Sequence, residues 1–245
     1  CFSVKSSMWQ WSERPCLGVP PLPVRSAGCA LIPLRSQQML VVCGGYDGNM
    51  RAKSEMHGAL LEDGQERLNW KHLGTAVEAH DHSLTVLDGS AYIFGGANDG
   101  HFSKRTLQID VGDTWATKTI ACKGDVPSPR ANHSVVFWKD ALWLFGGFNL
   151  LARNFVYNDL FTFDGVRWSR KQVEERPCAR SGHSCVAWRQ LLVVFGGWDG
   201  DGLLNDAFSF DEHRWHRLSP SGAAPSARAC HTATLLLGDQ MVVHG

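Results

Sequence analysis

Residues 130–147 read RANHSVVFWKDALWLFGG and contain the unit from which the rest of the chain can be interpreted. An arginine and a His-Ser pair come first, an apolar run follows, and a second apolar run ends in a glycine doublet. Apolar runs bounded by turn residues are typical of short strands that are covered on both faces. Glycines suit the end of such a strand, because a chain that turns there adopts conformations that a Cβ atom would block.

The glycine doublet recurs at a nearly constant interval. The doublets are Gly44-Gly45, Gly95-Gly96, Gly146-Gly147 and Gly196-Gly197, and the steps between them are 51, 51 and 50 residues. A further copy starts at residues 241–245. Self-similarity at a fixed period near fifty residues indicates a repeat architecture.

Each repeat has the same internal order. The motif Arg-x-x-His-Ser/Thr begins it at Arg130, Arg180 and Arg228, and strands of alternating polarity follow the doublet, as at 159–164 and 206–211. A short turn then leads to a tryptophan, and a proline-containing linker returns to the next repeat. The tryptophans are Trp70, Trp115, Trp168 and Trp215. This order predicts four strands per repeat and no helix.

The doublets, the tryptophans and the Arg-x-x-His motif together resemble Kelch repeats over essentially the whole chain. The resemblance implies an all-β, Kelch-type β-propeller of four-stranded antiparallel blades around a channel. The WD40 propeller is the alternative, but its period is about 40–45 residues, and Gly182-His183 and Trp198-Asp199 are its only marks here.

The chain is expected to be one partial propeller over residues 1–245. Residues 1–15, with Trp9 and Trp11, are expected to be the last strand of a preceding blade, and 228–245 the first half of a further blade. Four complete blades are expected at 25–70, 79–115, 130–168 and 180–215. The alternative is that the strand of Trp11 completes the blade begun at Arg228 in a closed five-bladed ring. Because the chain lacks an initiator methionine and stops in a repeat, we expect a fragment.

Composition narrows the classes of function. Lys plus Arg is 24 and Asp plus Glu is 24, so the net charge is zero. This argues against a nucleic-acid surface, which needs concentrated positive charge. No apolar run approaches the about 20 residues of a membrane helix. None of the 8 cysteines forms a CxxC pair, so a reduced cytoplasmic setting is expected, with the nucleus as an alternative.

Comparison of the repeats also predicts a buried ion pair. Arg130 and Arg180 start the first strand, while Asp159 and Asp206 start the third. The first repeat keeps Arg25 and has Glu55 at the acid position, with Gly28 at the histidine position. The second repeat has Ala79 and Arg105 instead, so it lacks both charges. Their joint loss is expected of a pair, because an unpaired buried charge costs several kcal/mol.

The sequence does not favour catalysis, a cofactor or a metal. His133-Ser134, His183-Ser184 and His231-Thr232 resemble parts of a catalytic triad. They recur once per repeat, however, which indicates a structural role. The run Asp199-Gly200-Asp201-Gly202 is interpreted as a turn, because the ligands of a calcium loop do not follow it.

The loops after the glycine doublets differ most between repeats, so we expect recognition there. In Kelch propellers these loops and the loops between blades open on one face. Arginine and aromatic residues are enriched at protein interfaces. The candidate binding residues are Met50, Arg51, Phe102, Arg105, Arg153, Phe155 and Trp198. A peptide acid or C-terminal carboxylate would suit Arg51, Arg105 and Arg153.

Two functions remain open. The first is a non-catalytic adaptor, scaffold or substrate-receptor propeller that binds a protein or peptide, similar to the Kelch-only and host-cell-factor-like group. The second is a carbohydrate-directed propeller enzyme such as a sugar mutarotase. A unique cluster of Arg, Glu and His at a channel mouth would favour the enzyme.

Overall fold

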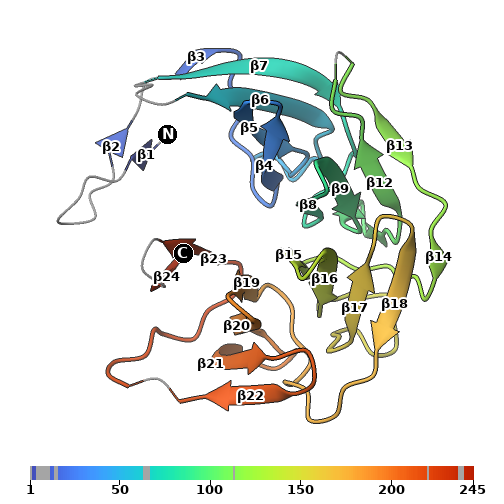
Figure 1. Cartoon of the computed structure of the whole chain (residues 1–245), viewed down its shortest axis with the longest axis vertical. Coiled ribbons are helices and arrows are strands. Elements are labelled where there is room, and N and C mark those ends of the chain that lie inside the picture. The colour runs from blue at the N-terminus through green and yellow to red at the C-terminus, as the bar shows by residue number, and fades with distance from the viewer. Residues whose placement is uncertain are drawn as a thin grey trace.

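A computed structural model describes residues 2–3, 12–13, 16–62, 67–112, 114–219, 221–236 and 240–245. Within these ranges the protein contains strands and no helix. The sheets stand side by side in an open arc around a central channel (Figure 1). The predicted all-β propeller class is confirmed.

Four sheets form the blades, named blades 1 to 4 in chain order. Blade 1 contains β3 (Cys16–Gly18), β4 (Gly28–Leu34), β5 (Gln37–Cys43), β6 (Glu55–Leu61) and β7 (Leu68–Thr75). Blade 2 contains β8 (Ser83–Leu87), β9 (Ser90–Phe94), β12 (Thr106–Ile109) and β13 (Thr117–Thr119). Blade 3 contains β14 (Lys123–Gly124), β15 (Ser134–Trp138), β16 (Ala141–Phe145), β17 (Leu160–Phe163) and β18 (Arg167–Lys171). Blade 4 contains β19 (Ser184–Trp188), β20 (Leu191–Trp198), β21 (Leu203–Phe210) and β22 (Trp215–Leu218).

The remaining strands form three separate pairs. They are β1 (Phe2–Ser3) with β2 (Ser12–Glu13), β10 (Ala97–Asn98) with β11 (His101–Phe102), and β23 (Thr232–Leu236) with β24 (Gln240–His244). The last pair follows blade 4 in the arc, and we call it the half-blade (Figure 1). Trp9 and Trp11, which the sequence assigns to a preceding blade, lie outside the described residues.

Blades 1 and 3 each have a fifth strand that the four-strand expectation did not include. β3 and β14 belong to the linkers that enter these blades, and each pairs in parallel with the outermost strand, β7 or β18. The other neighbours in the blade sheets pair antiparallel. The linker therefore crosses the outer edge of its blade before it turns inward to the first strand.

A belt of backbone hydrogen bonds joins the first strands around the channel. The residue two positions before each first strand has a positive φ. From blade 2 to the half-blade, its amide donates to the carbonyl of the equivalent residue in the preceding blade. The belt runs through Ser26, Asp81, Asn132, Gly182 and Cys230. These hydrogen bonds use only backbone groups and do not depend on which side chains are present. They therefore show which residues of the five repeats are equivalent.

The glycine doublets are required by contact between blades. Gly95 has a φ of 68°, and a Cβ atom there would lie 2.6 Å from the carbonyl oxygen of Arg130 in the next blade. It would also lie 2.8 Å from Cε1 of His133. The doublet therefore lets the strand turn and lets the next blade approach.

The repeated tryptophans fill the space between blades. Trp168 is buried, stacks on Phe163 of its own blade and packs on Phe94 of blade 2, with ring centroids 4.8 and 4.9 Å away. Its Nε1 donates to Thr106 Oγ1 of blade 2 at 3.0 Å. In blade 1 Cys43 occupies the position that Phe94 has in blade 2, and it is buried.

Candidate binding face

The expected ion pairs are present in blades 3 and 4. In blade 4, Arg180 Nη1 and Nη2 lie 2.7 and 3.1 Å from the two carboxylate oxygens of Asp206. The same two nitrogens of Arg130 lie 2.6 and 3.0 Å from those of Asp159. Both arginines are fully buried. Planar, two-point contact of this kind is the strongest form of arginine–carboxylate hydrogen bonding.

Each buried arginine also organises the backbone of its own blade. Arg180 Nη1 donates to the carbonyl of Gly196, the first glycine of the doublet, at 3.0 Å, and its Nε donates to the carbonyl of Cys178 in the linker at 3.2 Å. Arg228 repeats this pattern at Gly245 and Ser226. The side chain thus ties the linker, the doublet and the third strand together.

The assignment of Arg25 to this position is wrong by one residue. Arg25 forms a bridge with Tyr46, as Ala131 does with Phe148, so it is equivalent to Ala131 and not to Arg130. Val24 therefore occupies the arginine position of blade 1, and Arg25 is exposed. Gly28 pairs with Cys43 as Ser134 pairs with Phe145. The histidine position consequently falls on Ala27, one residue before Gly28.

The repeated histidines are structural. His183 Nε2 lies 2.9 Å from Ser134 Oγ, and His231 Nε2 lies 2.9 Å from Ser184 Oγ, so each ring reaches a serine of the preceding blade. Burial lowers the pKa of His82 to about 4 and that of His183 to about 3. The rings of His82 and His183 are therefore neutral near pH 7, and the partner of each belongs to the preceding blade: Cys43 for His82 and Ser134 for His183.

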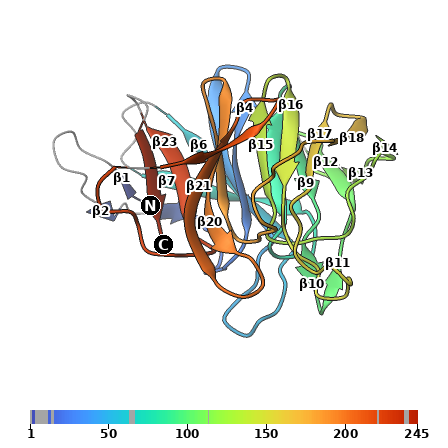
Figure 2. The ribbon, with the colours of Figure 1, turned by 90° about the horizontal axis from the view of Figure 1, so that it is seen from below.

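The loops after the glycine doublets gather on one side of the arc. Figure 2 shows β10 and β11 and the connection between β20 and β21 projecting from the same side. The shorter turns between first and second strands, such as that between β15 and β16, lie at the opposite side. The side with the longer loops is called the loop face.

The first loop is held by an aspartate and leaves its candidate residues exposed. Asp47 Oδ1 accepts hydrogen bonds from the amides of Asn49 and Arg51 at 2.9 and 3.1 Å, and its Oδ2 pairs with Lys53 at 2.9 Å. These bonds lower the pKa of Asp47 to about 2, with the Lys53 contact as the main cause. Met50 and Arg51 stand at the exposed end of this turn.

The second loop divides its two candidate residues. Phe102 is half-buried and packs edge-on against Phe148 of blade 3, with ring centroids 5.4 Å apart. Arg105 is exposed, but its Nη2 donates to Thr119 Oγ1 at 2.7 Å on β13, the outermost strand. The structure therefore places Phe102 between two loops and Arg105 at the outer edge of blade 2.

The third and fourth loops carry five large apolar residues, of which two form an aromatic pair. Phe155 of blade 3 lies 6.1 Å from Trp198 of blade 4 between ring centroids. Trp198 pairs across the β20–β21 hairpin with Leu203. The side chains of Leu150 and Leu151 are 65% and 73% exposed, in the same loop as Phe155. We call these five residues the 3/4 loop cluster.

Sequence reasoning missed three members of this cluster. Leu150, Leu151 and Leu203 belong to the divergent loops but are not among the candidate binding residues. Their position in a loop that follows a glycine doublet was the available signal, since a core leucine belongs to a strand of the repeat. Arg153 lies exposed in the same loop and adds a charge beside the cluster.

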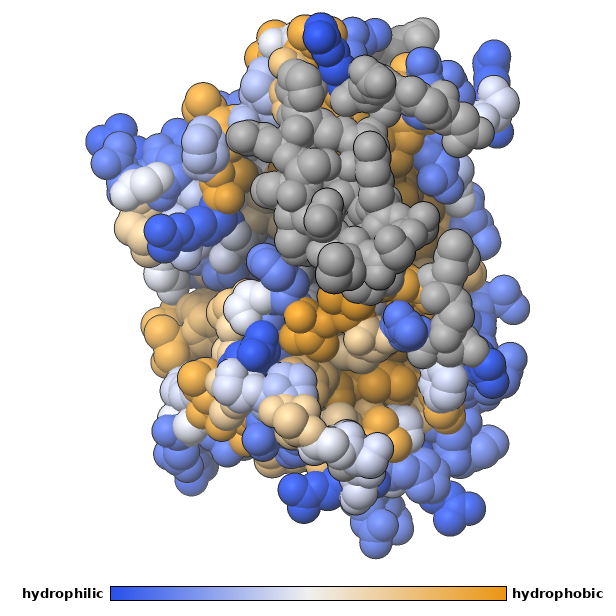
Figure 3. Space-filling model, turned by 90° about the vertical axis from the view of Figure 1, so that its left-hand side faces the viewer, coloured by the Kyte–Doolittle hydropathy of each residue, from blue (hydrophilic) through white to orange (hydrophobic). Residues whose placement is uncertain are grey.

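The channel offers a different kind of surface. A cavity of about 610 Å³ is lined by residues of β4, β8, β15, β19 and β23, mostly apolar, and Asp88 is the one charged residue among the described residues that line it. Figure 3 views the open side of the arc, where apolar side chains are exposed among hydrophilic ones.

The run at Asp199 is a turn, as expected. Its Oδ1 accepts hydrogen bonds from the amides of Asp201 and Gly202 at 3.0 and 2.8 Å. Over the described parts of the chain, no group of three or more His, Cys, Asp or Glu residues is placed to hold a metal ion. The same residues include no helix that could cross a membrane.

The chain is similar to known Kelch proteins. Residues 81–245 match the family described as the KLHDC2/KLHL20/DRC7 Kelch-repeats domain. The chain is 30% identical to the host cell factor homolog hcf-1 of Caenorhabditis elegans over 68% of its own length and 24% of that protein. It is 33% identical to human Kelch domain-containing protein 3, over 40% of its length and 28% of that protein.

A third relative is beta-scruin of Limulus polyphemus, 33% identical over 34% of this chain and 9% of that protein. The chain thus spans less than a third of the length of each of these three relatives. None of the three names states a catalysed reaction.

Proposed function

Because the chain belongs to the family of KLHDC2/KLHL20/DRC7 Kelch-repeats domains, we propose that it is a non-catalytic module that binds a peptide or protein surface through the loop face. The 3/4 loop cluster carries this proposal. Large exposed apolar side chains are costly to leave in water, and a group of them marks an interaction surface. Here they lie on loops that the rigid blades hold in place.

The partner is expected to present an apolar side chain beside an acid. Phe155 and Trp198 form a tilted aromatic pair that offers an apolar contact, while the side chain of Leu151 is exposed. Arg153 is exposed next to them and can bind a carboxylate with two parallel hydrogen bonds. The same interaction is available at Arg51 in the first loop.

Binding by a selected peptide tests the proposal. Peptides that bind the chain are selected from a random library, and their affinities for the unaltered protein and its variants are measured by fluorescence anisotropy. Replacing a true anchor, Phe155 or Leu151, by alanine is expected to weaken binding about thirtyfold, equivalent to about 2 kcal/mol. The melting temperature should not change, since both side chains are exposed.

Val166→Ala is the matched control, because Val166 is an exposed apolar residue in the turn between β17 and β18, away from the longer loops. It should leave the affinity unchanged. Undiminished binding by the triple variant Leu151→Ala, Arg153→Ala, Phe155→Ala would rule out the loop face as the site.

The sugar mutarotase alternative lacks a supporting observation. It needs Arg, Glu and His together at a channel mouth, and the described residues that line the cavity of about 610 Å³ include neither Arg, Glu nor His.

A further inference from the structure

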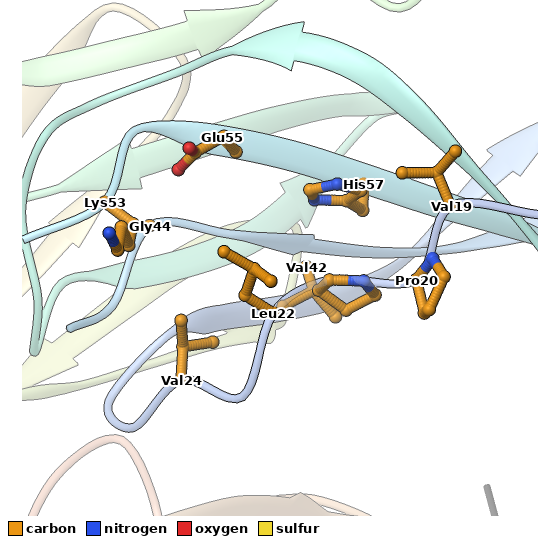
Figure 4. A pocket seen from close by; sticks show the side chains of 10 residues that line it. Val19, Pro20, Leu22, Val24, Val42, Gly44, Lys53, Glu55 and His57 are labelled. Atoms are coloured by element: carbon orange, nitrogen blue, oxygen red, sulfur yellow. The ribbon is translucent and has the colours of Figure 1, made fainter. Parts of the chain in front are cut away.

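Blade 1 contains a pocket of about 160 Å³ between strand β6 and the linker that enters the blade. Figure 4 shows Glu55 and His57 on β6 along one side and Leu22 and Val24 of the linker along the other. The carboxyl group of Glu55 points toward Gly44, the first glycine of the doublet. The pocket therefore has apolar walls and one acidic group.

The pocket is the blade 1 counterpart of the space that an arginine fills in blade 3. The amide of Gly44 donates to the carbonyl of Glu55, as the amide of Gly146 donates to the carbonyl of Asp159. Glu55 thus stands where Asp159 binds the guanidinium of Arg130. Val24 occupies the position of that arginine and is too short to reach the acid.

The other walls also correspond. His57 takes the place of Phe161, whose ring centroid lies 5.5 Å from the guanidinium carbon of Arg130. The carbonyl of Gly44 takes the place of the Gly146 carbonyl, which accepts from Arg130 Nη1 at 3.0 Å. An acceptor, a flat ring and a carboxylate are therefore arranged in blade 1 as they are around a bound guanidinium.

The carboxylate of Glu55 forms no ion pair among the described residues. Burial lowers the pKa of the neighbouring His57, and the charge of Glu55 only partly opposes this, so the ring does not supply a cation to the carboxylate near pH 7. Lys53 lines the pocket, but its ammonium group pairs with Asp47 at 2.9 Å. The ammonium group that lines the pocket is thus already paired with another carboxylate, and a carboxylate beside apolar side chains favours a cation from outside.

We propose that this pocket binds the guanidinium group of an arginine side chain supplied by a partner protein. Guanidinium is planar and offers two parallel donors to a carboxylate, which matches Glu55, and it stacks on a ring, which matches His57. A lysine ammonium is a point charge, so it can pair with Glu55 but offers neither two parallel donors nor a flat group that stacks on His57. The equivalent spaces of blades 3 and 4 hold arginine in both cases.

The inference stands apart from the loop face. The pocket is built from β6 and the entering linker of blade 1, whereas the 3/4 loop cluster lies on blades 3 and 4. Loss of binding at one site therefore leaves the other intact, and the two proposals can fail independently.

Titration with a blocked arginine tests the assignment. Nα-acetyl-arginine-N-methylamide is added to the 245-residue chain, and NMR shifts of the methyl groups of Val24 and Val42 are followed. Saturable shifts are expected with this compound and not with the citrulline analogue, which has the same shape and no charge. Glu55→Gln should weaken binding about tenfold, since it removes a charge-assisted hydrogen bond. Glu174→Gln, at an exposed acid in the linker that follows β18, is the charge-matched control.

Filling the pocket from inside provides a second test. Val24→Arg recreates the arginine of blades 3 and 4, so it should abolish binding of the blocked arginine and raise the melting temperature. Equal binding of the citrulline analogue, or full binding by Glu55→Gln, would overturn the proposal. Binding that appears only after Arg25→Ala would also overturn it, because the chain's own arginine would then be the occupant.

Discussion

Replacement of Asp206 by alanine examines the buried ion pair most directly. Arg180 is 0% exposed and Asp206 is 17% exposed, so the substitution leaves a guanidinium buried without its carboxylate. Removing one partner of a buried pair costs about 3–5 kcal/mol. Because the carbonyls of Gly196 and Cys178 still accept from Arg180, we expect the low end, about 3 kcal/mol.

A double-mutant cycle separates the pair from simple truncation. Arg180→Met keeps an unbranched apolar chain in the space and leaves Asp206 near solvent. In that background Asp206→Ala should cost about 1 kcal/mol or less, so the coupling energy is about 2 kcal/mol. Unfolding of the full chain in urea, followed by tryptophan fluorescence, measures both values, and an unchanged m-value would show that the extent of unfolding is the same.

Blade 1 supplies the matched comparison. Glu55 occupies the position of Asp206 but has no arginine opposite it, so Glu55→Ala should change stability by no more than about 0.5 kcal/mol. The reasoning is refuted if Asp206→Ala costs less than about 1 kcal/mol, or if it costs the same in the Arg180→Met background as in the unaltered protein.

Two further outcomes are expected. His82 and His183 have pKa values of about 4 and 3 in the folded protein, below the about 6.5 of an unfolded chain. Burial of the two neutral rings contributes its full stabilisation above the unfolded pKa, and this stabilisation is lost as the pH falls toward the folded pKa. The free energy of unfolding in urea should therefore be about 2 kcal/mol lower per histidine at pH 5 than at pH 7. Equal stability at both pH values would contradict neutral burial. Gly146→Ala should cost about 3 kcal/mol, because φ is 65° and the new Cβ would lie 2.5 Å from the Arg180 carbonyl oxygen. Gly202→Ala is its control, since nothing lies within 4 Å of a Cβ there, and a similar loss in both variants would show that φ and contact are not the cause.

The sequence could predict what the repeats share. The spacing of the doublets requires a repeating unit, and the parallel occurrence of Arg180 with Asp206 and of Arg130 with Asp159 is a direct consequence of burying a charge. Both inferences come from finding the same residue type at equivalent positions of several repeats. They hold because a buried position has the same chemical requirement in each blade.

The sequence could not place what differs between repeats. The sequence matches Arg25 with Arg130 because both are arginines. The backbone hydrogen bonds through Ser26 show instead that Arg25 is equivalent to Ala131. The entering linkers contain proline and no strand pattern, so the parallel strands β3 and β14 depend on contact with β7 and β18. Contacts across blades, such as that of Phe155 with Trp198, depend on the geometry of the arc and leave no local signal.

The contact between blades 1 and 2 shows how one substitution requires another. Cys43 stands where blades 2 to 4 have phenylalanine. Cysteine is smaller, and His82 Nε2 lies 3.4 Å from its sulfur. A Cβ atom on Gly28 would then lie 2.6 Å from the same nitrogen. The serine that blades 2 to 4 have at this position therefore cannot stand at Gly28 while His82 keeps its place. The residues that blade 1 lacks are thus linked to His82 of blade 2, which packs against it. Departures of one blade from the repeat pattern are therefore explained by the side chains of the adjacent blade.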